Sequence, residues 1–308
     1  MTAPHSVGDA GTTVPFRIAI PDAKLYRIHE RVRSYQWHET PIDSGWTYGT
    51  DRDFLRDLAT YWTERYDWRD AEHAMNRFPH FRATVTGVAE GDTLDVHFIH
   101  ARGSGDNPMP LLLLHGWPYS FASFTEIIEP LAHPERFGGD AADGFTVVVP
   151  SLPGYGFSGK PARPMGPQRM GDVLERLMTD VLGYHRYLVQ GGDWGGYIAS
   201  RMGFDHADHV AGVHSHSFLV WHDGVPLGSG QVGATDATDA ERGFVQHEQQ
   251  GFAVEGGYSV IQGTRPQSLS YAMLDSPVGV AGWILEKFHG CQTSENAPLQ
   301  KFFRGTAC

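Results

Sequence analysis

A carboxylate stands between paired glycines in the segment Gly191-Gly192-Asp193-Trp194-Gly195, directly after the apolar run 187–189. An apolar strand, a tight turn and a helix in this order predict a nucleophile elbow, the turn that presents a catalytic side chain at the tip of a strand. Small residues on both sides of the turn let the backbones pass closely. Serine is the usual residue at the centre of this turn, and here the position holds Asp193.

A carboxylate suits a different reaction from a serine hydroxyl. It needs no base to remove a proton, and its attack on an sp³ carbon gives an alkyl ester. We therefore interpret Asp193 as a nucleophile that opens an epoxide or displaces a halide, rather than one that cleaves an ester. The structural alternatives are a tight left-handed turn with an acidic residue at its tip, or an aspartate that caps the following helix.

Two further motifs follow apolar runs, His115-Gly116-Trp117-Pro118 and Leu152-Pro153-Gly154-Tyr155-Gly156-Phe157-Ser158. In elbow enzymes the loop after an earlier strand supplies one oxyanion-hole N–H, and the residue after the nucleophile supplies the other. We therefore predict that the backbone amides of Trp117 and Trp194 form an oxyanion hole, with a simple strand-ending turn as the alternative. Candidates for lining the pocket, with core packing as the alternative, are the aromatic residues Trp117, Tyr155, Phe157, Trp194 and Trp221.

The elements that must position these motifs are short apolar runs separated by helical patterns. The runs 111–114, 145–149 and 187–190 are typical of strands buried on both faces, and 210–216 is a candidate fourth strand. Strands that alternate with helices predict an α/β fold with a mostly parallel sheet and helices on both faces. The motifs would then meet at the carboxyl ends of the strands, where open parallel sheets carry their chemistry. The intervening helices are expected at 121–131 and 169–182.

The sequence patterns before and after these strands predict mainly helices. Asp22 is the expected cap of one helix, and Thr50-Asp51-Arg52-Asp53 reads as a capping box before a second. The other expected elements are a helix at 70–77, paired strands at 81–86 and 93–100, a loop at 220–245 and helices over 246–290.

Composition narrows the class of protein. The 308 residues carry 24 basic and 36 acidic side chains, a net charge of −12, and show no basic stripe, which argues against nucleic acid as a partner. Two cysteines make neither a disulfide framework nor a zinc site. Residues 1–14 are expected to be disordered and show no signal peptide, and the longest apolar run is four leucines. We expect a soluble, cytoplasmic protein without a membrane anchor.

Together these motifs resemble the microsomal type of epoxide hydrolase, which has the α/β-hydrolase fold. The matching segments are "PFRIAIPDAKLYRIHERV" (15–32), "GWTYG" (45–49), "DWRDAEHAMNRFPHF" (67–81), "LLLLHGWP", "PSLPGYGFS", "GGDWGG" and residues 256–290. The resemblance implies an N-terminal epoxide-hydrolase segment with the first strands at 15–110, a hydrolase core at 111–220 and a partial helical cap at 221–290. It does not extend to the tail 291–308.

The resemblance also implies roles for individual residues. Asp193 would be the nucleophile, and Tyr258 in "GGYSVIQ" would hydrogen-bond the epoxide oxygen as the ring opens. Ordinary packing within the cap is the alternative for Tyr258. The reaction would convert a small-to-medium apolar epoxide and water to a vicinal diol without a metal or an organic cofactor. Members of this family often form homodimers, so a homodimer is compatible with the resemblance.

The family also uses a histidine and an acid that activate water, and we assign neither here. Surface exposure or packing explains the candidate histidines His214, His216, His222, His247 and His289. The last strands of the fold are not found, so we expect a truncated or frameshifted chain that forms the ester and hydrolyses it slowly. The alternatives are a haloalkane dehalogenase with the same nucleophile, and a silent remnant that only binds epoxides or a partner.

Overall fold

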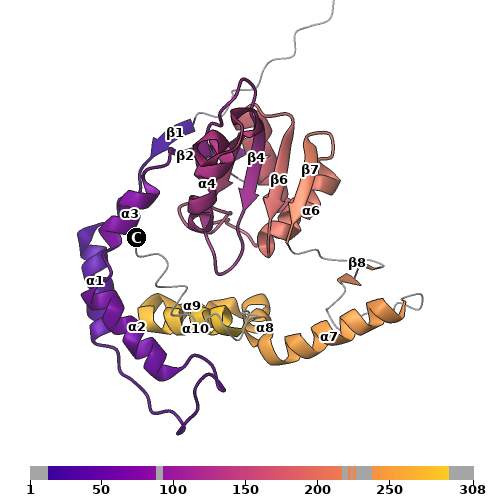
Figure 1. Ribbon diagram of the computed structural model, residues 1–308. Coiled ribbons are helices and arrows are strands. Elements are labelled where there is room, and N and C mark those ends of the chain that lie inside the picture. The colour runs from indigo at the N-terminus through magenta and orange to yellow at the C-terminus, as the bar shows by residue number, and fades with distance from the viewer. Residues whose placement is uncertain (1–12, 88–92, 217–220, 223–224, 227–237, 291–308) are drawn as a thin grey trace, which may run out of the picture. The chain divides into compact units, whose positions relative to one another are not determined.

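The computed structural model describes residues 13–87, 93–216, 221–222, 225–226 and 238–290. These residues form two compact units (Figure 1). The first contains the described residues up to Ala19 and those of Asp70–Leu219, and the second contains Ile20–Arg69 and the described residues from Val220 onward. The prediction for the tail 291–308 lies outside the described residues, and the domain boundaries expected from the sequence stay predictions.

A seven-stranded sheet of order β1-β2-β3-β5-β4-β6-β7 forms the centre of the first unit (Figure 1). Its strands are β1 (Thr13–Phe16), β2 (His80–Thr86), β3 (Thr93–Ala101), β4 (Met109–Leu114), β5 (Phe145–Pro150), β6 (Tyr187–Gly191) and β7 (Val210–Ser215). The pairs β4–β5, β4–β6 and β6–β7 are parallel, whereas β1, β2 and β3 add an antiparallel edge. The predicted parallel core and the predicted strand pair are therefore confirmed.

Helices cover the sheet because its central strands are apolar on both faces. Leu112 and Leu114 of β4 pack in one buried cluster with α5 (Pro167–Arg176), its π-helical continuation Leu177–Val181, and α6 (Trp194–Asp205). Alternate side chains of a strand point to opposite faces, so the buried Leu111 and Leu113 face the other way. The helix α4 (Thr125–Ala132), which follows the 3₁₀ turn Phe121–Phe124, contacts β5 and buries its own Ile128 outside that cluster.

The start of the described chain corrects one expectation. Disorder was predicted for residues 1–14, but Thr13 and Val14 belong to β1 and pair with Ala83 and Arg82 of β2. The remainder of that prediction lies outside the described residues. The ring of Phe16, at the end of β1, lies 5.1 Å from the ring of the buried His97, and this contact helps to hold the strand against the sheet.

The second unit is helical. The helices α1 (Asp22–Arg33), α2 (Arg52–Glu64) and α10 (Pro277–Gly290) contact one another around the buried residues Val32, Ala59 and Val278. The remaining elements after residue 220 are β8 (Trp221–His222), β9 (Val225–Pro226), α7 (Asp239–Glu255), α8 (Gly257–Thr264) and α9 (Pro266–Asp275). The helix α3 (Trp68–Met75) begins at the end of Ile20–Arg69 and continues into the first unit. Among the described residues, no helix is both long enough and apolar enough to cross a bilayer.

Helix starts show where the sequence-based expectations were wrong. Pro21 occupies the cap position of α1, and Asp22 instead forms an ion pair with Arg69. At α2 the cap is Asp51, which accepts a hydrogen bond of 2.7 Å from the Phe54 N–H, whereas Thr50 donates to the carbonyl of Gly282. The preceding residue was therefore mistaken for the cap.

The expected loop at 220–245 is also partly wrong. It contains the short pair β8–β9, and α7 already begins at Asp239 because Thr238 and Glu241 form a reciprocal capping box. The hydroxyl of Thr238 accepts from the Glu241 N–H, and the Glu241 carboxylate accepts from the Thr238 N–H. This capping box was visible in the sequence, but the many Gly, Asp and Thr residues of the segment led to the prediction of a loop.

A buried chain of hydrogen bonds links β2, β3 and the end of β5. Nε2 of His80 bonds the Met75 carbonyl, which only accepts, so this nitrogen carries the hydrogen. Nδ1 of His80 then accepts from Nε2–H of His97 at 2.9 Å, and Nδ1 of His97 accepts from the Ser151 hydroxyl at 2.9 Å. Both rings are therefore neutral. Burial is the main cause that lowers the pKa of His97 to about 3, and the positive charge of Arg82 adds to it.

This chain predicts a loss of stability in mild acid. In the unfolded chain His97 takes up a proton near pH 6.5, whereas in the folded protein it does so only near pH 3. The contribution of neutral His97 to the free energy of unfolding is therefore complete above about pH 6.5 and decreases as the pH falls towards about pH 3. Each pH unit in that window should cost ~1.4 kcal/mol per excess proton bound. Urea unfolding between pH 7 and pH 4 should show a smaller slope against pH for H97Q than for the wild type. The exposed His73 provides the control H73Q, and equal slopes for wild type and H97Q would contradict the assignment.

Candidate active site

Asp193 lies at the junction between β6 and α6, at the carboxyl end of the parallel strands. Its backbone has φ 50° and ψ −128°, a region that residues other than glycine rarely adopt. The following helix starts at once, because the Asp193 carbonyl accepts from the amides of Gly196 and Tyr197 at 2.9 and 3.2 Å. A strand, a strained turn residue and a helix are the geometry expected of a nucleophile elbow.

Three glycines allow the backbones to meet at this turn. A Cβ atom on Gly195 would lie 2.1 Å from the Leu114 carbonyl oxygen, at the end of the neighbouring strand β4. One on Gly191 would lie 2.2 Å from the backbone of Gly195, and one on Gly116 would lie 2.2 Å from Oδ1 of Asp193. The ends of β4 and β6 and the start of α6 are therefore packed backbone to backbone, as the paired glycines predicted.

The carboxylate of Asp193 does not cap the helix that follows it. The Asp193 side chain makes none of the hydrogen bonds by which a capping residue satisfies the start of the helix that follows it. Instead, Oδ1 accepts a hydrogen bond of 2.7 Å from the backbone N–H of Trp117, and the Trp194 N–H also bonds the carboxylate. The helix-cap alternative is therefore wrong, and the two amides named from the sequence are the ones that contact Asp193.

Burial and hydrogen bonding act in opposite directions on Asp193. Burial raises its pKa, because the charged form loses hydration, whereas the amides of Trp194 and Trp117 stabilise the carboxylate and limit that rise. The charge of Asp193 adds to burial in raising the pKa of Tyr155 to about 12, and it adds to burial in raising the pKa of Tyr197. Two neutral phenols therefore lie within electrostatic reach of the Asp193 carboxylate.

His115 joins the two strand-end loops beneath the site. Its buried ring accepts at Nε2 from the Leu152 N–H at 3.1 Å and lies 3.1 Å at Nδ1 from the Gly116 carbonyl. Burial lowers the pKa of His115 to about 4, so the ring is neutral with its hydrogen on Nδ1. The ring packs edge-on against Tyr155, with the ring centres 5.2 Å apart. This contact fixes the loop that carries the Trp117 amide.

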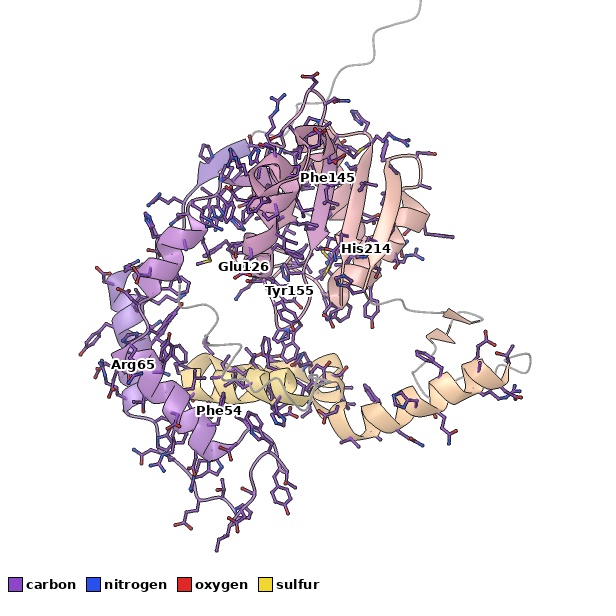
Figure 2. All side chains as sticks on the ribbon, viewed as in Figure 1. Phe54, Arg65, Glu126, Phe145, Tyr155 and His214 are labelled. Carbon is purple, nitrogen blue, oxygen red and sulfur yellow. The ribbon has the colours of Figure 1, made fainter. Side chains whose placement is uncertain are left out.

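The aromatic candidates differ in their surroundings. Figure 2 shows Tyr155 towards the same end of the sheet as His214 of β7 and away from Phe145, which begins β5. Trp117, Tyr155 and Phe157 are half-buried, whereas the side chain of Trp194 is 40% exposed. The side chain of Trp221 is not among those described.

Tyr258 belongs to the second unit, as the second residue of α8. It is half-buried, and the ammonium of Lys287 lies 5.1 Å from its ring centre. Its proposed contact with an epoxide therefore stays a prediction.

The histidines left unassigned fall into separate places. His214 and His216 are exposed at the end of β7, with ring centres 5.0 Å apart, and the backbone N–H of His216 bonds the Gly191 carbonyl. His289 stacks on Trp46 at 4.1 Å in the second unit, which is the packing role expected of it. His247 is exposed on α7, and the side chain of His222 is not among those described.

Sequence reasoning missed two contributors to this site. His115 was seen only as part of its motif, although a histidine directly after a buried strand is well placed to bond a neighbouring loop. Tyr197 was seen only as a helix former. Its position four residues after Asp193, one turn along α6, brings it near the carboxylate.

Comparisons with known proteins identify families and relatives that this chain resembles. The model for the epoxide hydrolase N terminus matches residues 13–124, and that for the alpha/beta hydrolase fold matches residues 109–247. Epoxide hydrolase 1 of Oryctolagus cuniculus is 32% identical over 300 residues, which cover 93% of this chain and 64% of that protein. The chain thus spans a little under two thirds of the length of this curated relative.

Solved structures show the same relationship. The crystal structure of juvenile hormone epoxide hydrolase from the silkworm Bombyx mori matches with a TM-score of 0.71 and 29% identity, covering 90% of this chain and 63% of that chain. The structure of Aspergillus niger epoxide hydrolase matches with a TM-score of 0.74 and 27% identity, covering 90% of this chain and 70% of that one.

The neighbouring glycines of the turn give a matched test of its packing. G195A should lower the free energy of unfolding by about 3 kcal/mol or more, because the added methyl meets the Leu114 carbonyl and neither backbone can move away. G192A should stay within about 1 kcal/mol of the wild type, because its methyl meets the His216 ring at an ordinary 3.5 Å. Urea unfolding measures both, and equal losses would contradict the close backbone contact.

Proposed function

Because this chain belongs to the epoxide hydrolase family of the α/β-hydrolase fold, we propose that it opens an epoxide through an ester on Asp193. The observation that carries the proposal is the carboxylate on a strained elbow, hydrogen-bonded to the amides of Trp117 and Trp194. A serine at this turn would need a base to become nucleophilic, whereas an ionised carboxylate attacks directly.

In the first half-reaction a carboxylate oxygen of Asp193 attacks one carbon of the epoxide. A new C–O bond forms, the C–O bond of the strained ring breaks, and the ring oxygen leaves with the electron pair. Tyr258 donates its phenol hydrogen to that oxygen, which becomes an alcohol. The role of Tyr258 rests on the resemblance of "GGYSVIQ" to the cap of the family.

In the second half-reaction water attacks the carbonyl carbon of the ester. The amides of Trp117 and Trp194 stabilise the negative oxygen that develops, as an oxyanion hole does. The diol then leaves, the carboxylate of Asp193 is restored and the proton returns to the phenolate of Tyr258. The histidine and acid that would activate this water remain unassigned, so we propose that ester hydrolysis is the slow step in the 308-residue chain.

The substrate we propose is a small-to-medium apolar epoxide. Tyr155 and Phe157, both half-buried in the loop after β5, would supply aromatic surface to such a molecule. The relatives are named for epoxide hydrolysis, and one is named for juvenile hormone. The chemistry of Asp193 supports an epoxide as the substrate class, and it does not favour the substrate of any one relative.

The proposal is tested by the mass of the intact protein before and after reaction with styrene oxide. We expect the mass to rise by one epoxide equivalent, located on Asp193 by peptide mapping, with diol appearing more slowly than the adduct. D193A should form no such adduct. D172A is the matched control and should react like the wild type, because Asp172 pairs with His206 at the far end of α6, a helix ~18 Å long.

Other outcomes of the same measurement would redirect or overturn the proposal. Unchanged mass together with no diol, in a protein that is folded by circular dichroism, would mean that the chain is catalytically silent. Halide release from a chloroalkane without any reaction with epoxide would identify a dehalogenase instead. Diol without a lasting adduct would leave the function standing and overturn the assignment of ester hydrolysis as the slow step.

A further inference from the structure

A buried ammonium group lies at the junction of three helices in the second unit. The side chain of Lys287, on α10, is 6% exposed. Its Nζ donates to the backbone carbonyl of Glu255 at 3.0 Å, to the Glu255 carboxylate at 2.9 Å, and lies 2.8 Å from the Glu286 carboxylate. An ammonium has three hydrogens to donate, and three acceptor oxygens surround this one.

These contacts keep Lys287 charged in spite of its burial. Burial alone would lower the pKa of Lys287, but the hydrogen bonds and negative charges of Glu286 and Glu255 outweigh it, and the pKa is raised. Removing the lysine would leave the Glu255 carbonyl and two carboxylates without this partner. The position of the ammonium is thus set by the end of α7 and by α10 itself.

The same ammonium lies over the ring of Tyr258. The distance from Nζ to the ring centre is 5.1 Å, within the range of a cation–π contact. Only two glycines separate Glu255 from Tyr258, so Lys287 contacts both sides of the turn between α7 and α8. A second contact joins α10 to α8, since Nε1 of Trp283 on α10 donates to Gln262 on α8 at 2.8 Å.

This arrangement matters because a tyrosine that donates to an epoxide oxygen must hold its hydroxyl in one direction. An exposed tyrosine at the start of a helix can rotate about χ1, and a misplacement of about 1 Å can slow a reaction about 100-fold. A fixed cation against one face of the ring restricts that rotation.

We propose that Lys287 is a positioning residue that holds the Tyr258 phenol in the orientation needed for epoxide opening. The inference rests on the proposed function, because it matters for the reaction only if Tyr258 donates to the epoxide oxygen. It adds to that function a residue to which the resemblance assigns no role, and it gives a chemical purpose to a buried charge that the mechanism does not otherwise use.

The test compares two reagents that react with the same carboxylate. Styrene oxide needs a hydrogen donor for its leaving oxygen, whereas benzyl bromide loses bromide without one when Asp193 attacks its benzylic carbon. The rates of adduct formation on Asp193 are measured for both by peptide mass in wild type, Y258F, K287M and K287R. Y258F should slow the reaction of styrene oxide at least ~10-fold and leave benzyl bromide within about 2-fold.

K287M should show the pattern of Y258F, with the epoxide slowed ~10-fold and the bromide nearly unchanged. K287R, which keeps the cation, should recover much of the epoxide rate. Equal slowing of both reagents by K287M would mean that Lys287 only stabilises the fold, and no slowing of either would mean that Tyr258 needs no such support. Either result overturns the inference and leaves the proposed function intact.

Two further results are decisive. If Y258F reacts with styrene oxide as fast as the wild type, the assigned role of Tyr258 fails, and this inference fails with it. If K287M does not fold, as judged by circular dichroism, E255Q is measured by the same criteria, since it weakens one of the contacts that place the ammonium. A smaller loss confined to the epoxide supports the inference, and equal rates or equal losses for the two reagents overturn it.

Discussion

The site depends on backbone contact between the ends of two parallel strands and the start of one helix. Gly195 meets the Leu114 carbonyl, and Gly116 meets the carboxylate of Asp193, at separations that allow no side chain. This contact brings the Trp117 amide within 2.7 Å of the carboxylate and holds Asp193 in a strained conformation. The sheet, the covering helices and the neutral ring of His115 all maintain that short distance.

The covering elements stabilise the site through burial on opposite faces of one sheet. The strand β4 carries four consecutive leucines. Leu112 and Leu114 pack against α5 and α6, and the buried Leu111 and Leu113 point to the opposite face of the sheet. The end of β4 therefore cannot shift without disturbing the packing on both faces. The buried chain from Met75 through His80 and His97 to Ser151 fixes the end of β5 in a similar way, through neutral rings. Such a framework suits a turn residue such as Asp193, which must be held in a backbone conformation that it would not otherwise adopt.

The backbone geometry around Asp193 was largely predictable because its signals are local. Paired glycines around Asp193 and the loop motif at His115 specify close backbone contact and amide donors without reference to the rest of the chain. The cap positions of α1 and α2 were less predictable. Asp22, expected to cap α1, pairs with the distant Arg69. At α2 the sequence suggested a capping box that starts at Thr50, whereas the side chain that accepts from the Phe54 amide belongs to the next residue. Long-range contacts such as that of Lys287 with Glu255 leave no signature in the spacing of residues along the chain.

The central claim is that an oxygen of Asp193, rather than one from water, becomes bonded to the substrate. The most direct test is a reaction in H₂¹⁸O with the protein in excess over styrene oxide. Diol that the protein releases is collected, and diol that remains bound as the ester is freed by mild alkali. If Asp193 attacks the epoxide, the diol is unlabelled and ¹⁸O appears in the peptide that contains Asp193, because water attacks the ester carbonyl. A diol that carries ¹⁸O beside an unlabelled peptide would show direct attack of water on the epoxide and would contradict the account.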